Sequence, residues 1–143
     1  MSDKLFALAK AGEVNEMLEA LSQAQAADDD GSETVVASYQ WLLVAAALGS
    51  EEAEGMAEDL VEAALSRYGD ETIAMAHFEV GGWWLLGQEG VTKDSDKAFA
   101  ELEYADEMGV REMVDIESEL EKLRSQSGAA ERERLATLFP PRG

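Results

Sequence analysis

The chain has 143 residues, of which 11 are lysine or arginine and 31 are aspartate or glutamate, so its formal net charge is −20. Since 46% of the residues are hydrophobic, the composition predicts one folded domain and excludes a disordered acidic tail. The acidity argues against binding to nucleic acid or anionic lipid, and the absence of cysteine excludes disulfides and thiolate metal ligands.

No segment is expected to cross or enter a membrane. The longest strongly apolar run covers residues 35–48, which is shorter than the roughly 18 residues that a membrane span needs. Residues 1–10 contain neither a basic leader nor a cleavage site behind an apolar stretch. We therefore expect a cytoplasmic protein.

Helical periodicity extends along the whole chain, and no stretch alternates as a strand would, so the sequence predicts an all-α fold. The first four helices are expected at residues 2–12, 14–27, 33–48 and 51–67, with a break at the cluster 28–32. The third of them is apolar on nearly every side. Such a helix must be covered on most of its faces.

Four further helices are expected at residues 70–86, 95–108, 110–124 and 129–138, the last ending before two prolines. The fifth helix is apolar on more than one face and should be central. The seventh carries a narrow apolar stripe, which either caps the fold or forms a homodimer: Met113, Ile116, Leu120 and Leu123. The domain is expected to cover residues 1–139, followed by a short tail at 140–143.

Two segments of the chain match each other at an offset of 60 residues: Trp41-Leu42-x-x-Ala45-x-x-x-Gly49 and Glu101-Leu102-x-x-Ala105-x-x-x-Gly109. The second copy follows the string Gly90-Val91-x-x-Asp94-x-x-Lys97-Ala98. With these motifs the chain resembles the Sel-one-like repeat family, relatives of tetratricopeptide repeats, over residues 73–109 and 35–49. The resemblance implies a short right-handed helical-repeat solenoid of antiparallel helix hairpins, with about seven to eight helices in all. It also implies that the protein binds other proteins.

Small residues at recurring helical positions agree with close helix packing. Glycine at Gly81 and Gly82 would each destabilise a helix by about 1 kcal/mol relative to alanine, so we expect neighbouring backbones to approach there. The aromatic rings of Trp41 and Trp84 should fill the space between successive hairpins.

The sequence contains no recognisable catalytic or metal-binding motif. The only histidine is His77, which excludes any site that needs two histidines. The acidic run at residues 28–33 lacks the spacing of a calcium loop, and the carboxylate pairs Glu101 with Asp106 and Glu117 with Glu121 are expected to form a solvated face. We therefore expect no catalysis, no metal and no cofactor.

Aromatic and acidic residues are the candidates for binding a protein partner. Adjacent helical residues point about 100° apart, so Trp84 can be core while Trp83 either anchors a partner or packs on a neighbouring helix; Tyr39 and Tyr104 are weaker candidates of the same kind. Acidic side chains on three helical regions would steer a basic partner. The predicted binding residues are Trp83, His77, Tyr104, Glu101, Glu103, Glu107, Glu58 and Glu62.

These features favour a specific inhibitor of a basic protein, and the repeat resemblance suggests the immunity partner of a bacterial toxin. The alternative is a general adaptor or assembly scaffold in a larger complex, whose binding would survive salt better. A third hypothesis, an enzyme that uses carboxylates and His77, ranks last.

Overall fold

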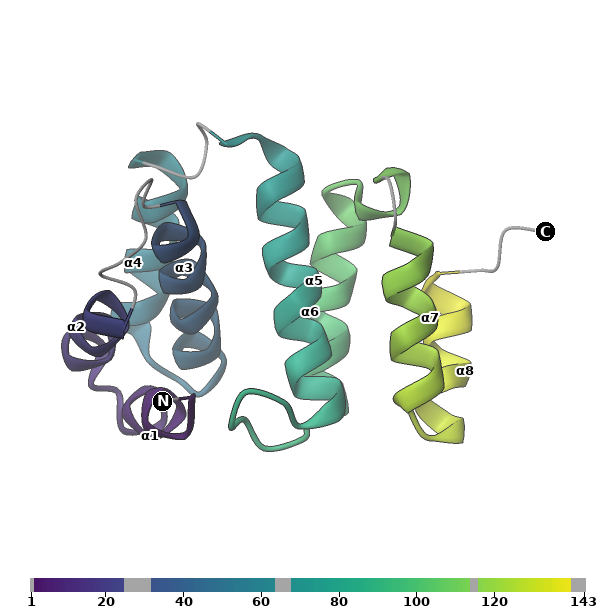
Figure 1. Cartoon of the computed structure of the whole chain (residues 1–143), viewed down its shortest axis with the longest axis horizontal. Helices are drawn as coiled ribbons and strands as arrows, with labels where there is room; N and C mark the ends of the chain where they lie inside the picture. The colour runs from purple at the N-terminus through teal and green to yellow at the C-terminus, as the bar shows by residue number, and fades with distance from the viewer. Residues whose placement is uncertain (1, 25–31, 64–67, 114–115, 140–143) are drawn as a thin grey trace.

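The computed structural model describes residues 2–24, 32–63, 68–113 and 116–139, and within these ranges the chain is all-α, with eight α-helices and no strand (Figure 1). The α-helices are α1 (Ser2–Ala11), α2 (Val14–Ala24), α3 (Ser32–Ala47), α4 (Glu51–Ala63), α5 (Asp70–Leu86), α6 (Ser95–Glu107), α7 (Ile116–Gln126) and α8 (Ala129–Leu138). A short 3-10 helix, η2, covers Val110–Glu112.

The predicted helix boundaries agree with the structure where glycine or a capping side chain sets them. Helix α5 ends at Gly87, which has a φ of 70° and donates its backbone N–H to the carbonyl of Trp83. Residues 28–31 of the predicted break at 28–32, the predicted helix ends at Ala27 and Arg67, and the tail at 140–143 lie outside the described residues.

The prediction of one helix over Val110–Arg124 is wrong at its start. Gly109 adopts a φ of 91°, and the chain then forms η2 before α7 begins at Ile116. The guanidinium of Arg111 donates two hydrogen bonds to Asp106, at 2.5 Å and 2.9 Å, which holds η2 against the end of α6. As a result Met113 lies outside α7 with extended backbone.

The apolar stripe predicted for the seventh helix is mostly interior. Ile116, Leu120 and Leu123 are buried in the core, while Met113 is partly buried against it. These side chains therefore pack within the chain. A homodimer through the same residues would have to uncover three of them.

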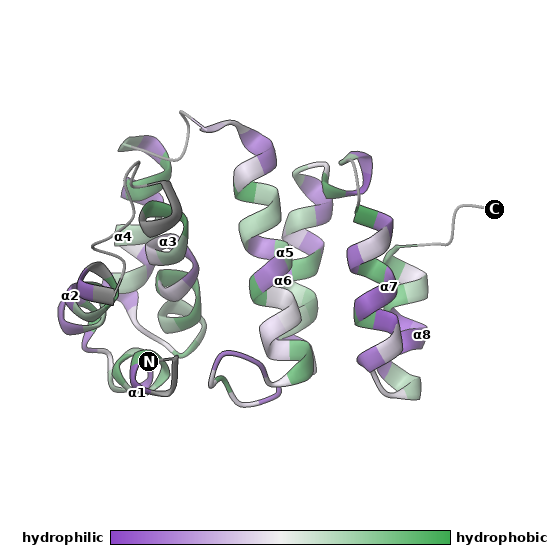
Figure 2. Ribbon diagram, viewed as in Figure 1, coloured by the Kyte–Doolittle hydropathy of each residue, from purple (hydrophilic) through white to green (hydrophobic). Residues whose placement is uncertain are grey.

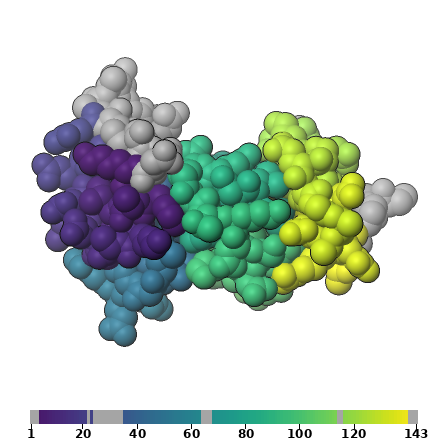
Figure 3. Space-filling view, turned by 90° about the horizontal axis from the view of Figure 1, so that it is seen from below, coloured from purple at the N-terminus to yellow at the C-terminus, as the bar shows by residue number. Residues whose placement is uncertain are grey.

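Helices α1 to α4 lie together at one end of the molecule, and α5 with α6 and then α7 with α8 follow along its long axis (Figure 1). Helix α3 packs against α1, α2 and α4, and α5 packs against α3, α6 and α7. Seen from below, α5 and α6 separate the N-terminal helices from α7 and α8 (Figure 3). Helix α5 is thus central, as its apolar faces predict.

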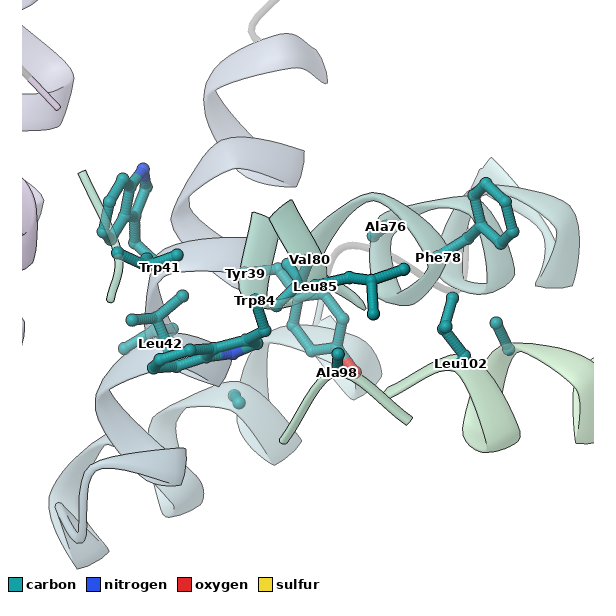
Figure 4. Packing of buried hydrophobic residues seen from close by; sticks show 14 of the residues in the cluster. Tyr39, Trp41, Leu42, Ala76, Phe78, Val80, Trp84, Leu85, Ala98 and Leu102 are labelled. Carbon is teal, nitrogen blue, oxygen red and sulfur yellow. The ribbon is translucent and has the colours of Figure 1, made fainter. Parts of the chain in front are cut away.

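Aromatic rings connect α5 to both ends of the molecule. The ring of Trp84 meets Phe6 of α1 edge-on at 6.5 Å, and Phe78 meets Phe139 after α8 at 6.3 Å. Leu42 of α3 lies beside Trp84 in the core (Figure 4). Buried hydrophobic residues from all eight helices form one core, and hydrophilic residues make up much of α7 (Figure 2). None of the described helices combines the length and the apolar character of a bilayer-spanning segment.

The predicted close approach of helix backbones occurs at Gly81. A Cβ atom at this position would lie 2.8 Å from the side chain of Leu102 and 3.1 Å from the carbonyl oxygen of Ala98, so α6 leaves no room for a side chain. At Gly82 the nearest atom belongs to Leu123 of α7, at 3.4 Å. Gly81 therefore sets how closely α5 and α6 pack.

The motif between α5 and α6 has a structural explanation. Gly90 adopts a φ of 82°, Val91 is buried, and the backbone N–H of Asp94 donates to the carbonyl of Trp84 at 2.8 Å. The carboxylate of Asp94 accepts the backbone N–H of Lys97 and so caps α6. The hydrogen bonds and charge of Lys97 lower the pKa of Asp94 below its usual value.

Candidate functional site

His77 lies between three helices and is hydrogen-bonded at both ring nitrogens. The hydroxyl of Tyr39, on α3, lies 2.7 Å from Nε2, and the carboxylate of Glu101, on α6, lies 2.5 Å from Nδ1. The ring of Tyr104 stacks on the imidazole at 4.0 Å. We call these four residues the His77 cluster.

The geometry fixes the hydrogen-bond directions in the His77 cluster when the imidazole is neutral. A carboxylate only accepts, so Nδ1–H donates to Glu101, Nε2 accepts, and the hydroxyl of Tyr39 donates to it. Burial raises the pKa of Tyr39, and the neighbouring Tyr104 and Glu101 raise it further, so this hydroxyl keeps its proton. The cluster thus assigns each of its protons to one donor, and its hydrogen bonds connect α3, α5 and α6.

Two sequence interpretations are corrected by this cluster. Tyr39 is 4% exposed and bonded to His77, so it does not face a partner. Glu101 was expected on a solvated face, but its side chain is only 16% exposed because it contacts the imidazole. His77, also 4% exposed, lies in the interior, whereas Tyr104 is 44% exposed and carries the cluster to the surface.

Helix α5 has a second candidate site, a groove along one of its faces. One hollow, of about 340 Å³, is lined by Met75 and Glu79 together with residues of α3 and the segment after η2. Another, of about 160 Å³, is lined by Glu79, Trp83 and Leu86 together with residues of α7. Both hollows share Glu79, and Met75, Glu79, Trp83 and Leu86 follow one another along one face of α5. We call this face with its two hollows the α5 groove.

Trp83 packs on a neighbouring helix, as one of the two sequence interpretations predicts. Its ring packs on Trp41 of α3, with centroids 5.4 Å apart, so it does contact a neighbouring helix. It is also half-buried and lines the α5 groove, and its role as a partner anchor stays a prediction. Trp84 is buried, as predicted.

The predicted acidic binding residues occupy different helices. Glu103 and Glu107 lie with Tyr104 on the exposed face of α6, and Glu103 also lines a hollow of about 640 Å³ against α8. Glu58 and Glu62 are exposed on α4, which packs mainly on α3. The structure therefore brings His77, Glu101 and Tyr104 together but leaves Trp83 and the α4 carboxylates apart from them.

The other carboxylate pairs from the sequence interact with arginines. Asp106 binds Arg111, while Glu117 and Glu121 have oxygens 3.9 Å and 3.5 Å from Arg124 Nη1. Within the described ranges, no group of three or more histidine, aspartate or glutamate side chains is arranged to hold a metal ion.

Gln40 and Glu79 are site residues that no sequence motif marks. The buried side-chain amide of Gln40 donates to the carboxylate of Glu79 at 2.9 Å and approaches the carbonyl of Ala76 at 3.4 Å. Each of the two residues interrupts a long apolar helix, which is a signal that the side chain has a partner or a task. Their separation of 39 residues gives no hint that they meet.

Comparison of this chain with models of protein families, with curated protein sequences and with solved structures finds no match.

Proposed function

We propose that this chain is a non-catalytic, acidic protein-binding module. In this proposal the eight helices form a short right-handed solenoid of antiparallel hairpins, in which α1 pairs with α2, α3 with α4, α5 with α6 and α7 with α8. The packing of α3 on α4 and of α5 on α6 supports this grouping. Successive first helices of such hairpins would line one side of the molecule.

The observation that carries the proposal is the α5 groove. It combines partly exposed apolar side chains, Met75, Trp83 and Leu86, with the exposed carboxylate of Glu79. Tryptophan is enriched among residues that dominate binding energy at protein interfaces. An open groove of this kind suits a segment of another protein.

The charge of the molecule favours a basic partner. Helix α4 carries six acidic residues and no basic one, and the formal net charge of the chain is −20. Such a field accelerates encounter with a positively charged protein and loses its effect as salt rises. Glu58, Glu62, Glu103 and Glu107 are proposed to steer the partner toward the groove.

The more specific form of the proposal is a cytoplasmic inhibitor, such as the immunity protein of a bacterial toxin. The high acidity and the resemblance to Sel-one-like repeats support this form, and a basic enzyme is the expected target. Its alternative is an adaptor in a larger assembly.

The test is capture of partners from the source lysate by the immobilised chain, with elution in rising salt and identification by mass spectrometry. The proposal expects one dominant basic protein, released by salt and lost when Trp83→Ala replaces the wild type. Several components of one complex, held in high salt, would favour the adaptor. If nothing is captured, the proposal fails.

A further inference from the structure

We propose that the α5 groove recognises a lysine or arginine side chain of the partner, which binds Glu79 while apolar side chains on both sides of it fill the two hollows. This inference rests on the proposed function and specifies its ligand. The occupant is a protein segment with the order apolar, basic, apolar.

The carboxylate of Glu79 is exposed and yet held in position. Gln40, which is 5% exposed and belongs to the neighbouring helix α3, donates its amide to Oε2 of Glu79 at 2.9 Å. A carboxylate has two oxygens and accepts several hydrogen bonds, so it retains capacity for a further donor. A preorganised acceptor lowers the entropy that binding must overcome.

Apolar surface lies on either side of this carboxylate. Met75 lines the hollow of about 340 Å³ with Val36 and Met113, while Trp83 lines that of about 160 Å³ with Leu123. Met75 and Trp83 are each four residues from Glu79, which is about 6 Å along a helix axis. A helical ligand beside α5 would match these positions with side chains at i, i+4 and i+8.

The charges of the groove select a basic side chain over an acidic one. Besides Glu79, the lining includes Glu71 at one end and Glu119 with Lys122 at the other. Glu119 and Lys122 are 3.3 Å apart and form an ion pair with each other. The centre of the groove is therefore negative, and burying a partner's cation against Glu79 would form a charge-assisted hydrogen bond.

The probe is a displayed library of random peptides of roughly 15 residues, long enough for four helical turns, selected on the full chain at moderate salt. We expect the enriched sequences to share a lysine or arginine that has an apolar residue on each side. In helical peptides each apolar residue should be four positions from the basic one. Glu79→Gln should weaken the best of them by about tenfold or more, as expected for a hydrogen bond to a charged group.

Two controls separate recognition from folding and from general charge. The glutamine in Glu79→Gln offers an amide oxygen to Gln40, so thermal unfolding should stay close to that of the wild type. Glu54→Gln removes the same charge from the exposed surface of α4 and should leave peptide affinity unchanged. Replacing the peptide's basic residue by methionine should weaken binding to the wild type but add little to the loss in Glu79→Gln.

The inference is overturned if no sequence is enriched, if the enriched peptides lack a basic residue, or if the two substitutions weaken binding additively. A lysate partner that binds Glu79→Gln as tightly as the wild type would also overturn it while leaving the proposed function intact. Conversely, peptides that behave as expected without any lysate partner would support the groove chemistry and refute the proposed function.

Discussion

At the scale of single residues, the His77 cluster shows how polar side chains stabilise a mostly apolar core. Tyr39 and Glu101 come from different helices and meet the two nitrogens of one imidazole. Removal of one partner leaves a buried polar atom without its hydrogen bond, which destabilises more than the bond itself contributes. The cluster is therefore expected to determine how α3, α5 and α6 fit together.

Tyr39→Phe tests this role with the smallest possible change. The substitution leaves Nε2 of His77 without a donor, so we expect the free energy of unfolding to fall by about 1–3 kcal/mol. Urea unfolding at neutral pH measures it. Tyr68→Phe is the matched control, because Tyr68 is 41% exposed, and its effect should stay within about 0.5 kcal/mol. Equal effects of both substitutions would contradict the assigned role of Tyr39.

At the scale of elements, glycine and caps determine where helices end and how closely they pack. Gly81 faces Leu102 without room for a Cβ atom, whereas a Cβ at Gly55 of α4 would meet nothing within 4 Å. The two glycines thus have the same effect on helix propensity, but only Gly81 affects packing.

Gly81→Ala should destabilise the protein by about 1–3 kcal/mol through overpacking, reduced by the gain in helix propensity. Gly55→Ala should stabilise it by up to about 1 kcal/mol, since only the propensity gain applies. Thermal or urea unfolding of both variants measures the contrast. A stable Gly81→Ala variant would mean that α5 and α6 do not approach as described.

Asp94→Ala tests the cap of α6 through its dependence on pH. The folded pKa of Asp94 is lowered, so its charged form stabilises the fold above the usual aspartate pKa, and this contribution is lost as pH falls through the folded value. We expect a loss of about 1 kcal/mol at pH 7 that shrinks below about pH 4. A gap between wild type and variant that does not change with pH in urea unfolding would refute the charged cap.

The sequence predicted most elements because their signals are local. Apolar periodicity identified α5 as central, and glycines identified many helix ends. The start of α7 was missed because residues 110–113 continue a helical pattern, while the ion pair of Arg111 with Asp106 favours a 3-10 turn instead. The His77 cluster and the Gln40–Glu79 contact depend on packing between distant helices, which no local pattern encodes.

At the scale of the whole molecule, the negative charge is neutralised by basic residues in some regions and not in others. Between Lys93 and Arg134, basic side chains of the chain itself neutralise part of the acidity through ion pairs such as that of Arg134 with Asp96. Helix α4 has no basic residue of its own. The electrostatic field of the molecule should therefore chiefly raise the rate at which a basic partner associates, and this rate should fall as the salt concentration rises.

Charge reversal tests this steering. Replacing Glu58, Glu103 and Glu107 together by lysine should slow association with the captured partner by about tenfold or more at low salt and leave dissociation less affected. Glu101 is left unchanged because its carboxylate belongs to the His77 cluster. Stopped-flow kinetics at several salt concentrations measure the rates. Association that is insensitive to both salt and the reversals would show that the acidity serves solubility only.

Site-specific photo-crosslinking shows whether a partner protein occupies the α5 groove. A photoreactive amino acid replaces Met75 in the groove or, as control, Gln23 on the distant helix α2, and the source cells are irradiated. We expect the Met75 position to crosslink to one basic protein and the Gln23 position to give no crosslink to it. Crosslinking of that protein from Gln23, with none from Met75, would contradict occupancy of the groove.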